Sequence, residues 1–203
     1  MAAISLGVAA AGSAQAINVV NGDLWHVPEA ISQDATPGNV PGSTPDVTFS
    51  VDSPFNFSAD SATVGTWLGS SGAFGIVENT AGTLASLMDN GTMGTLLSFT
   101  GFVTVTTGQM FTVTHDDGLS MSIGGVDLAF SPGPTSAVTS IATYTGASGN
   151  QPFNLVYGEC CGGPAVLQVD LPLVTPVPEP ETYTLLLAGL AAVGWISRRR
   201  RRT

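Results

Sequence analysis

The placement of the basic side chains is the strongest constraint on how this chain can fold. The sequence contains fifteen aspartates and glutamates but only five lysines and arginines, and those five are all arginines near the C-terminal end. Every carboxylate before residue 198 therefore lacks a Lys or Arg partner. Each must be solvated, hydrogen-bonded to amides or hydroxyls, or neutralised by a bound cation. The arginines are Arg198, Arg199, Arg200, Arg201 and Arg202.

The same distribution excludes several functional classes. A nucleic-acid-binding protein neutralises phosphates with Lys and Arg, which the body of this chain lacks, so we expect no nucleic-acid partner. A phosphate-binding loop of the Walker type needs a lysine. An arginine clamp for a carboxylate or phosphate substrate is excluded in the same way.

The N-terminal sequence predicts a secretory signal peptide over residues 1–16. A small apolar run, Ala2 to Ala11, precedes Ala14-Gln15-Ala16, which has the spacing of a signal-peptidase site. The run lacks the basic residues that usually open such signals, and the alternative interpretation is a short buried helix. The exported body would then be residues 17–172.

The C-terminal sequence predicts a single membrane-spanning helix. A Pro-rich stalk at 173–181 precedes an apolar segment at 182–197, and the arginines lie in a tail at 198–203. The segment is short for a bilayer core of about 30 Å, although Trp195 and the arginines are suited to the interfaces. Positive charges stay on the cytoplasmic side, so the body of the chain is expected outside the cytoplasmic membrane.

This C-terminal order resembles the PEP-CTERM sorting signal. The elements are Pro178-Glu179-Pro180, a short apolar helix and a terminal arginine run. The resemblance implies export in a Gram-negative bacterium that makes exopolysaccharide. It also implies a membrane-anchored precursor that an exosortase processes, with a final location at the cell surface or outside the cell. The alternative is an ordinary tail anchor.

Between these ends the sequence predicts an all-β fold, an antiparallel β-sandwich or barrel. Short runs rich in β-branched residues alternate with Gly, Pro and Asp turn signals. We also expect a surface connection over Gly22–Thr44 and one short helix over Thr83–Asp89. The predicted strands are Asp46–Val51, Thr63–Leu68, Leu96–Thr106, Gln109–His115, Leu119–Ile123, Val126–Phe130, Val138–Tyr144, Phe153–Tyr157 and Ala165–Val169.

Asp116-Asp117-Gly118 is the candidate functional motif. Two adjacent carboxylates repel each other, and no Lys or Arg is near them in the sequence, so a bound Ca²⁺ with its preference for oxygen ligands would relieve the repulsion. The alternative is a tight turn, because Asp and Gly are favoured turn residues and Asp can bind its own backbone.

The segment from about residue 96 to 171 resembles the PA14 β-barrel family. The shared pattern is a strand, Asp116-Asp117-Gly118, a second strand, and later Tyr157-Gly158-Glu159 before a hairpin. In the adhesin branch of that family the Asp pair coordinates Ca²⁺, which helps to hold sugar hydroxyls. The resemblance thus implies Asp116 and Asp117 as metal ligands. Gly118 and Glu159 are expected to be structural, with Glu159 accepting hydrogen bonds from loop amides. Asn150 and Asn154 are candidates for further ligands.

Cys160 and Cys161 are adjacent in the sequence. Neighbouring Cα atoms are about 3.8 Å apart, which is closer than relaxed disulfides allow, although an exported protein meets oxidising conditions. We leave two states open, a strained disulfide between neighbours or two thiols. Two cysteines and two distant histidines do not have the spacing of a zinc site.

We predict an exported, noncatalytic surface or matrix protein, associated with exopolysaccharide and binding carbohydrate with Ca²⁺. One alternative is a secreted polysaccharide hydrolase with His115 or His26 as base. It is weakened because adjacent Asp side chains cannot flank a scissile bond from opposite sides. The other alternative is a self-associating protein of surface filaments, since the strands are Thr-rich and carry little charge.

Overall fold

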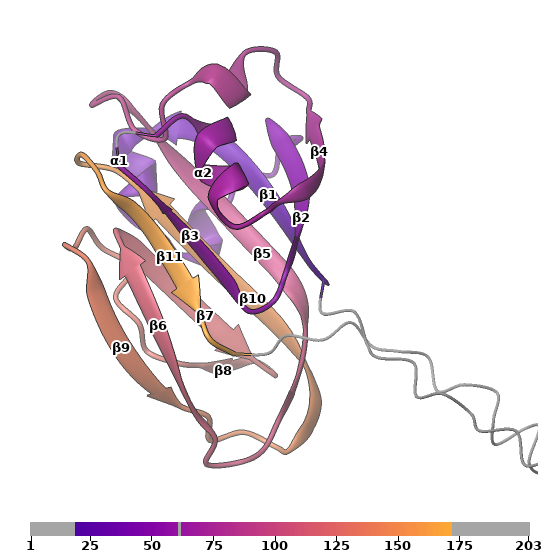
Figure 1. Ribbon diagram of the computed structural model, residues 1–203. Helices are drawn as coiled ribbons and strands as arrows, with labels where there is room; N and C mark the ends of the chain where they lie inside the picture. The colour runs from indigo at the N-terminus through magenta and orange to yellow at the C-terminus, as the bar shows by residue number, and fades with distance from the viewer. Residues whose placement is uncertain (1–18, 61, 172–203) are drawn as a thin grey trace, which may run out of the picture.

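The computed structural model describes residues 19–60 and 62–171 (Figure 1). The predicted signal peptide, the stalk, the membrane segment and the arginine tail all lie outside the described residues. Within the described part of the chain, none of the helices has the length and apolar character needed to cross a membrane.

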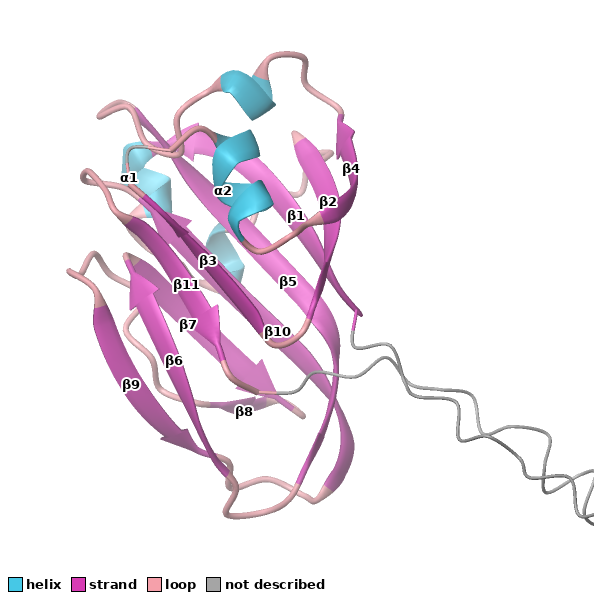
Figure 2. Cartoon of the chain, viewed as in Figure 1, coloured by secondary structure: helices cyan, strands magenta, loops and turns pink. Residues whose placement is uncertain are grey.

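Two antiparallel sheets pack face to face, with the four-stranded sheet in front of the seven-stranded one in Figure 2. The larger sheet has the order β4-β2-β1-β5-β10-β7-β8, and the smaller has the order β3-β11-β6-β9. The predicted all-β sandwich is confirmed. The strands are β1 (Val19–Pro28), β2 (Val47–Asp52), β3 (Phe55–Ala59), β4 (Phe74–Glu78), β5 (Met93–Val105), β6 (Met110–Asp116), β7 (Gly118–Ile123), β8 (Val126–Asp127), β9 (Val138–Thr143), β10 (Gly149–Glu159) and β11 (Ala165–Val169).

The main core lies between the sheets, where alternate residues of each strand point inward. Aromatic rings form a connected part of this core. The Trp67 ring stacks on Phe57 with centroids 4.2 Å apart, and on Tyr157 with centroids 5.8 Å apart. The Trp67 indole also donates a hydrogen bond to the Ala165 carbonyl at 3.2 Å. These contacts fix the Tyr157 ring, whose hydroxyl reaches the site described below.

A second, smaller core covers one half of the outer face of the seven-stranded sheet. Trp25, Val27, Leu96 and Val156 point away from the other sheet and pack with Ala35. The connection between β1 and β2 lies over them; it contains the helix α1 (Glu29–Ser32) and a 3-10 turn at Pro37–Asn39. Among residues 19–60 and 62–171, no segment covers the other half of this face in the same way.

One predicted strand is a helix. The segment Thr63–Leu68 forms most of α2 (Val64–Ser70), although its β-branched residues favour a strand. The Thr63 side chain accepts a hydrogen bond from the Thr66 amide, which caps the helix. Val64, Trp67 and Leu68 then share one buried face at helical spacing, and this burial outweighs the intrinsic strand preference.

The N-terminal half differs from the prediction in three further ways. The expected surface connection over Gly22–Thr44 begins as β1, a central strand that pairs with both β2 and β5. β3 and β4 were not predicted. The expected helix over Thr83–Asp89 is a single 3-10 turn at Thr83–Ala85.

We predict that Trp67→Ala lowers the free energy of unfolding by about 3–5 kcal/mol, because it empties the centre of the aromatic stack and leaves the Ala165 carbonyl without its donor. Urea denaturation followed by circular dichroism measures the change. Phe74→Ala is the matched control, because this ring is 44% exposed on an edge strand. Its expected change is within about 0.5 kcal/mol. Equal losses for the two variants would contradict the packing described here.

Candidate functional site

The candidate site lies at one end of the sandwich, where the chain crosses between the sheets twice. β6 belongs to the smaller sheet and β7 to the larger one, and Asp117 is the only residue between them. β10 and β11 are divided between the sheets in the same way and are joined by residues 160–164. The two crossings are neighbours, because Gly118 pairs with Gly158 and Asp116 pairs with Val166.

The Asp117 carboxylate ties these crossings together. One oxygen accepts a hydrogen bond from the Cys160 amide at 3.0 Å, and the other accepts one from the Thr135 amide at 3.1 Å. The partners are 43 and 18 residues away. The geometry therefore differs from the tight turn considered above, in which Asp binds its own backbone. The Asp116–Asp117 peptide bond is cis.

Gly118 is needed for close approach of a neighbouring loop. A Cβ atom at this position would lie 2.0 Å from the Pro132 carbonyl oxygen, so any larger residue would push the loop away. The same loop supplies the Thr135 amide to Asp117. The close approach of Pro132 is a physical reason for glycine at position 118.

Glu159 takes a different partner from the loop amides that we expected. Its carboxyl group is 1% exposed and forms a hydrogen bond with the Tyr157 hydroxyl, which is also bonded to the Asp116 carbonyl. The loop amides are taken by aspartates instead, since Gly162 donates to Asp89 at 2.9 Å and Cys160 to Asp117. A phenol has a single proton, so both contacts of Tyr157 are hydrogen bonds when Glu159 is protonated and donates to the phenol oxygen.

The pKa shifts follow from burial of acids without a basic partner. Desolvation raises the pKa of Glu159 to about 9, and the nearby negative charges of Asp117, Asp116 and Asp89 act in the same direction. Desolvation also raises the pKa of Asp116, with repulsion from Asp117 adding to it. For Asp117, desolvation again raises the pKa, while the amides of Cys160 and Thr135 oppose the shift.

The two cysteines extend this site toward solvent. Cys160 is buried and Cys161 is exposed, and both are free thiols with their sulfurs 2.7 Å apart. Burial raises the pKa of the Cys160 thiol strongly. The two sulfurs and a carboxylate oxygen of Asp117 all lie within 4.8 Å of one another. This set supplies three ligands, none of them a histidine, whereas a structural zinc site uses four ligands.

His115 has a structural position in this arrangement. Its ring is 1% exposed, its Nδ1 is hydrogen-bonded to the Asp117 carbonyl, and it packs edge-on against Phe130. Burial lowers the pKa of His115. A ring that is enclosed and hydrogen-bonded to a carbonyl cannot reach a substrate, so this geometry disfavours His115 as the base of a hydrolase.

The candidate ligands Asn150 and Asn154 do not reach this end. Asn154 lies on β10 four positions before Gly158, which corresponds to about 13 Å along a strand. Asn150 lies farther away along the same strand. Sequence reasoning missed Asp89, which the loop before β5 brings to Gly162. Its only local signal was the following Asn90-Gly91 pair, which indicates a turn and not a partner 73 residues away.

Comparison with known proteins supports both resemblances stated from the sequence. Residues 176–202 match the PEP-CTERM protein-sorting motif, so the protein is exported and carries a C-terminal sorting signal. The fold is that of PA14 domains. The chain aligns with the PA14 domain of the MpAFP antifreeze protein at a TM-score of 0.50 and 19% identity, over 80% of this chain and 86% of that one.

A PA14 sugar-binding domain from an RTX adhesin aligns at a TM-score of 0.49 and 19% identity, covering 76% of this chain and 89% of the other. No curated protein matches the sequence.

We predict that the protein, free of divalent cations, becomes less stable as the pH rises from about 4.5 to 9, the ordinary and folded-state pKa of Glu159. Within this interval the unfolded chain releases a proton that the folded chain retains, so unfolding becomes more favourable with pH. Glu159→Gln imitates the protonated group. The variant should be about as stable as the parent protein near pH 5. Its unfolding should release about one proton fewer than that of the parent within this pH range. Thermal unfolding in EDTA across this range measures both effects; an unchanged slope would contradict the assignment.

We predict that iodoacetamide modifies one thiol in the native, reduced protein and two in guanidinium chloride. Cys161 is exposed, whereas burial and a raised pKa both suppress the thiolate of Cys160. Mass spectrometry counts the adducts. Cys161→Ser should leave no rapidly reacting thiol in the native state, and two native adducts on the parent chain would contradict the burial of Cys160.

Proposed function

We propose that this protein is an exported, noncatalytic cell-surface or matrix component that binds carbohydrate through a calcium ion held by Asp116 and Asp117. The observation that carries this proposal is the convergence of acids at one end of the sandwich. Asp116, Asp117 and Glu159 are 5%, 4% and 1% exposed, respectively, and no Lys or Arg occurs before residue 198 to balance them.

The donor set fits Ca²⁺. Carboxylate oxygens are the ligands that this ion prefers, and it takes six to eight oxygens, carbonyls and waters included. The oxygens of Asp117 that accept amide hydrogens each retain a second lone pair. A divalent cation would offset the desolvation that raises the pKa of both aspartates. When bound, Ca²⁺ supplies a positive centre for sugar hydroxyls.

The sorting motif supports the proposed location. PEP-CTERM sorting implies processing by an exosortase after export. An acidic, calcium-binding domain released at the cell surface would meet exopolysaccharide, the partner that we propose for it. The protein then acts by adhesion, without a chemical step.

The calcium site predicts a specific response to the ion. Isothermal titration calorimetry of the full chain should give one Ca²⁺ per molecule. The melting temperature should rise more with CaCl₂ than with NaCl at matched ionic strength, because screening alone is common to both salts. At a hundredfold excess over the dissociation constant the stabilisation is about 2.7 kcal/mol.

The control variant loses the same number of negative charges, but at positions outside the proposed calcium site. Asp116→Asn/Asp117→Asn should abolish the calcium heat, whereas Asp52→Asn/Asp60→Asn removes two exposed charges elsewhere and should retain it. Binding to a glycan array with and without EDTA then tests the sugar. Equal heats for the two double variants would refute the calcium site, and EDTA-independent binding to every glycan would refute its role in recognition.

A further inference from the structure

A row of polar side chains crosses the open half of the outer face of the seven-stranded sheet. The register of five strands places its members directly opposite one another, from β1 through β5, β10 and β7 to β8. Neighbouring strands are about 4.8 Å apart, so the row is about 19 Å long. Its members are Asn21, Thr100, Asn154, Ser122 and Asp127.

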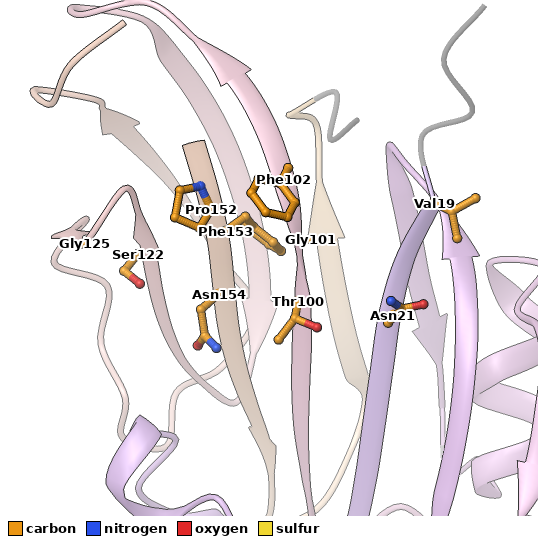
Figure 3. Close-up of a pocket in the computed structure, with 10 residues that line it drawn as sticks. All are labelled: Val19, Asn21, Thr100, Gly101, Phe102, Ser122, Gly125, Pro152, Phe153 and Asn154. Atoms are coloured by element: carbon orange, nitrogen blue, oxygen red, sulfur yellow. The ribbon is translucent and has the colours of Figure 1, made fainter. Parts of the chain in front are cut away.

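An apolar row runs beside the polar one. Phe102 pairs with Pro152 two positions along the strands from Thr100 and Asn154, and therefore on the same face. The Phe102 ring is 39% exposed. Figure 3 shows the two levels, with Asn154, Thr100 and Asn21 at one height and Phe102 and Pro152 at the next. Val19 on β1 lines the same surface pocket as Asn21 and Phe102.

These rows line a groove in the protein surface. Its main part has a volume of about 520 Å³, and a second hollow of about 160 Å³ adjoins it and shares Ser122, Gly125 and Asn154. The second hollow is also lined by Ser120, whose Oγ is buried and lacks a hydrogen-bond partner within the described residues.

The polar row has unused hydrogen-bonding capacity. Within residues 19–60 and 62–171, the side chains of Thr100, Ser122 and Asn154 form no hydrogen bond with another residue. Asn21 only accepts one from Ser50, at 3.3 Å. The amide groups can donate and accept together, as the hydroxyls can. Such a set matches a ligand that presents many hydroxyl groups.

The charge of the groove selects among such ligands. The row ends at Asp127 on β8, and Asp23 lies two positions from Asn21 on β1, on the same face. No Lys or Arg precedes residue 198. An anionic polymer would therefore meet repulsion without a compensating base, whereas a neutral one would not.

We propose that this groove is a second glycan-binding site, which holds a neutral polysaccharide chain laid across the strands. The sugar rings would place their apolar C–H faces on Phe102 and Pro152 and their hydroxyls on Asn21, Thr100 and Asn154. The site is separate from the calcium end, because Asn154 is about 13 Å along β10 from Gly158. Binding here does not need Ca²⁺, and the proposal stands whether or not the calcium site exists.

The test is a nuclear magnetic resonance titration of the full ¹⁵N-labelled chain in EDTA, in a detergent without a sugar headgroup. The probes are cellohexaose, xylohexaose, mannohexaose and, as the anionic counterpart, galacturonic acid hexamer. At least one neutral hexasaccharide should shift the amide signals of the groove residues, and the galacturonate should not. Asn154→Ala should weaken binding about threefold to tenfold, and Phe102→Ala about tenfold.

Matched controls lie elsewhere on the surface. Thr143→Ala on the outer face of the smaller sheet and Phe74→Ala on β4 should retain the parent affinity. The titration is run in EDTA, which separates this site from the proposed calcium site. The proposal is overturned if no neutral probe shifts the amide signals of the groove residues. That result is expected if another part of this chain fills the groove. The proposal is also overturned if the galacturonate binds equally, or if the control variants weaken binding as much as Asn154→Ala.

Discussion

Burial of negative charge without a basic partner is the constraint on which the rest of this structure depends. A salt bridge would normally compensate a buried carboxylate, and here no Lys or Arg is available before residue 198. The fold compensates by other means. Asp117 collects two backbone amides, Asp89 collects another, and Glu159 keeps its proton and bonds to Tyr157. The charge that these contacts leave uncompensated is the reason for the cation that we propose at this end of the sandwich.

The aromatic core and the acidic end are parts of one arrangement. Tyr157 contributes its ring to the stack with Trp67 and its hydroxyl to Asp116 and Glu159. The packing of the sandwich thus determines where the hydroxyl lies, while burial in the same region raises the pKa of the Glu159 carboxyl that contacts it. On the outer face, the strand register alone positions the groove residues, because it aligns side chains from five strands.

The sequence predicted the fold class and the C-terminal half well, because period-2 runs and Gly-rich turns there are governed by local preference. It predicted the wrong structure at Thr63–Leu68, where a buried face at helical spacing outweighs β-branched residues. Through a family pattern it singled out Asp116 and Asp117 as metal ligands and Glu159 as a structural residue, but it did not predict the contact between Glu159 and Tyr157. It could not supply Asp89 or the polar row of the groove, because both depend on strand pairing between segments that are distant in the chain.

The sheet crossings also determine in which state of the chain the acidic end exists. Its hydrogen bonds join residues 43 and 73 positions apart, so it exists only when segments that are distant in the chain have come together. Before that point the same carboxylates are separate and solvated, and they ionise as ordinary acids. The electrostatic cost of gathering them therefore belongs to the folded state, and a cation that bound there would stabilise the folded sandwich and not the unfolded chain.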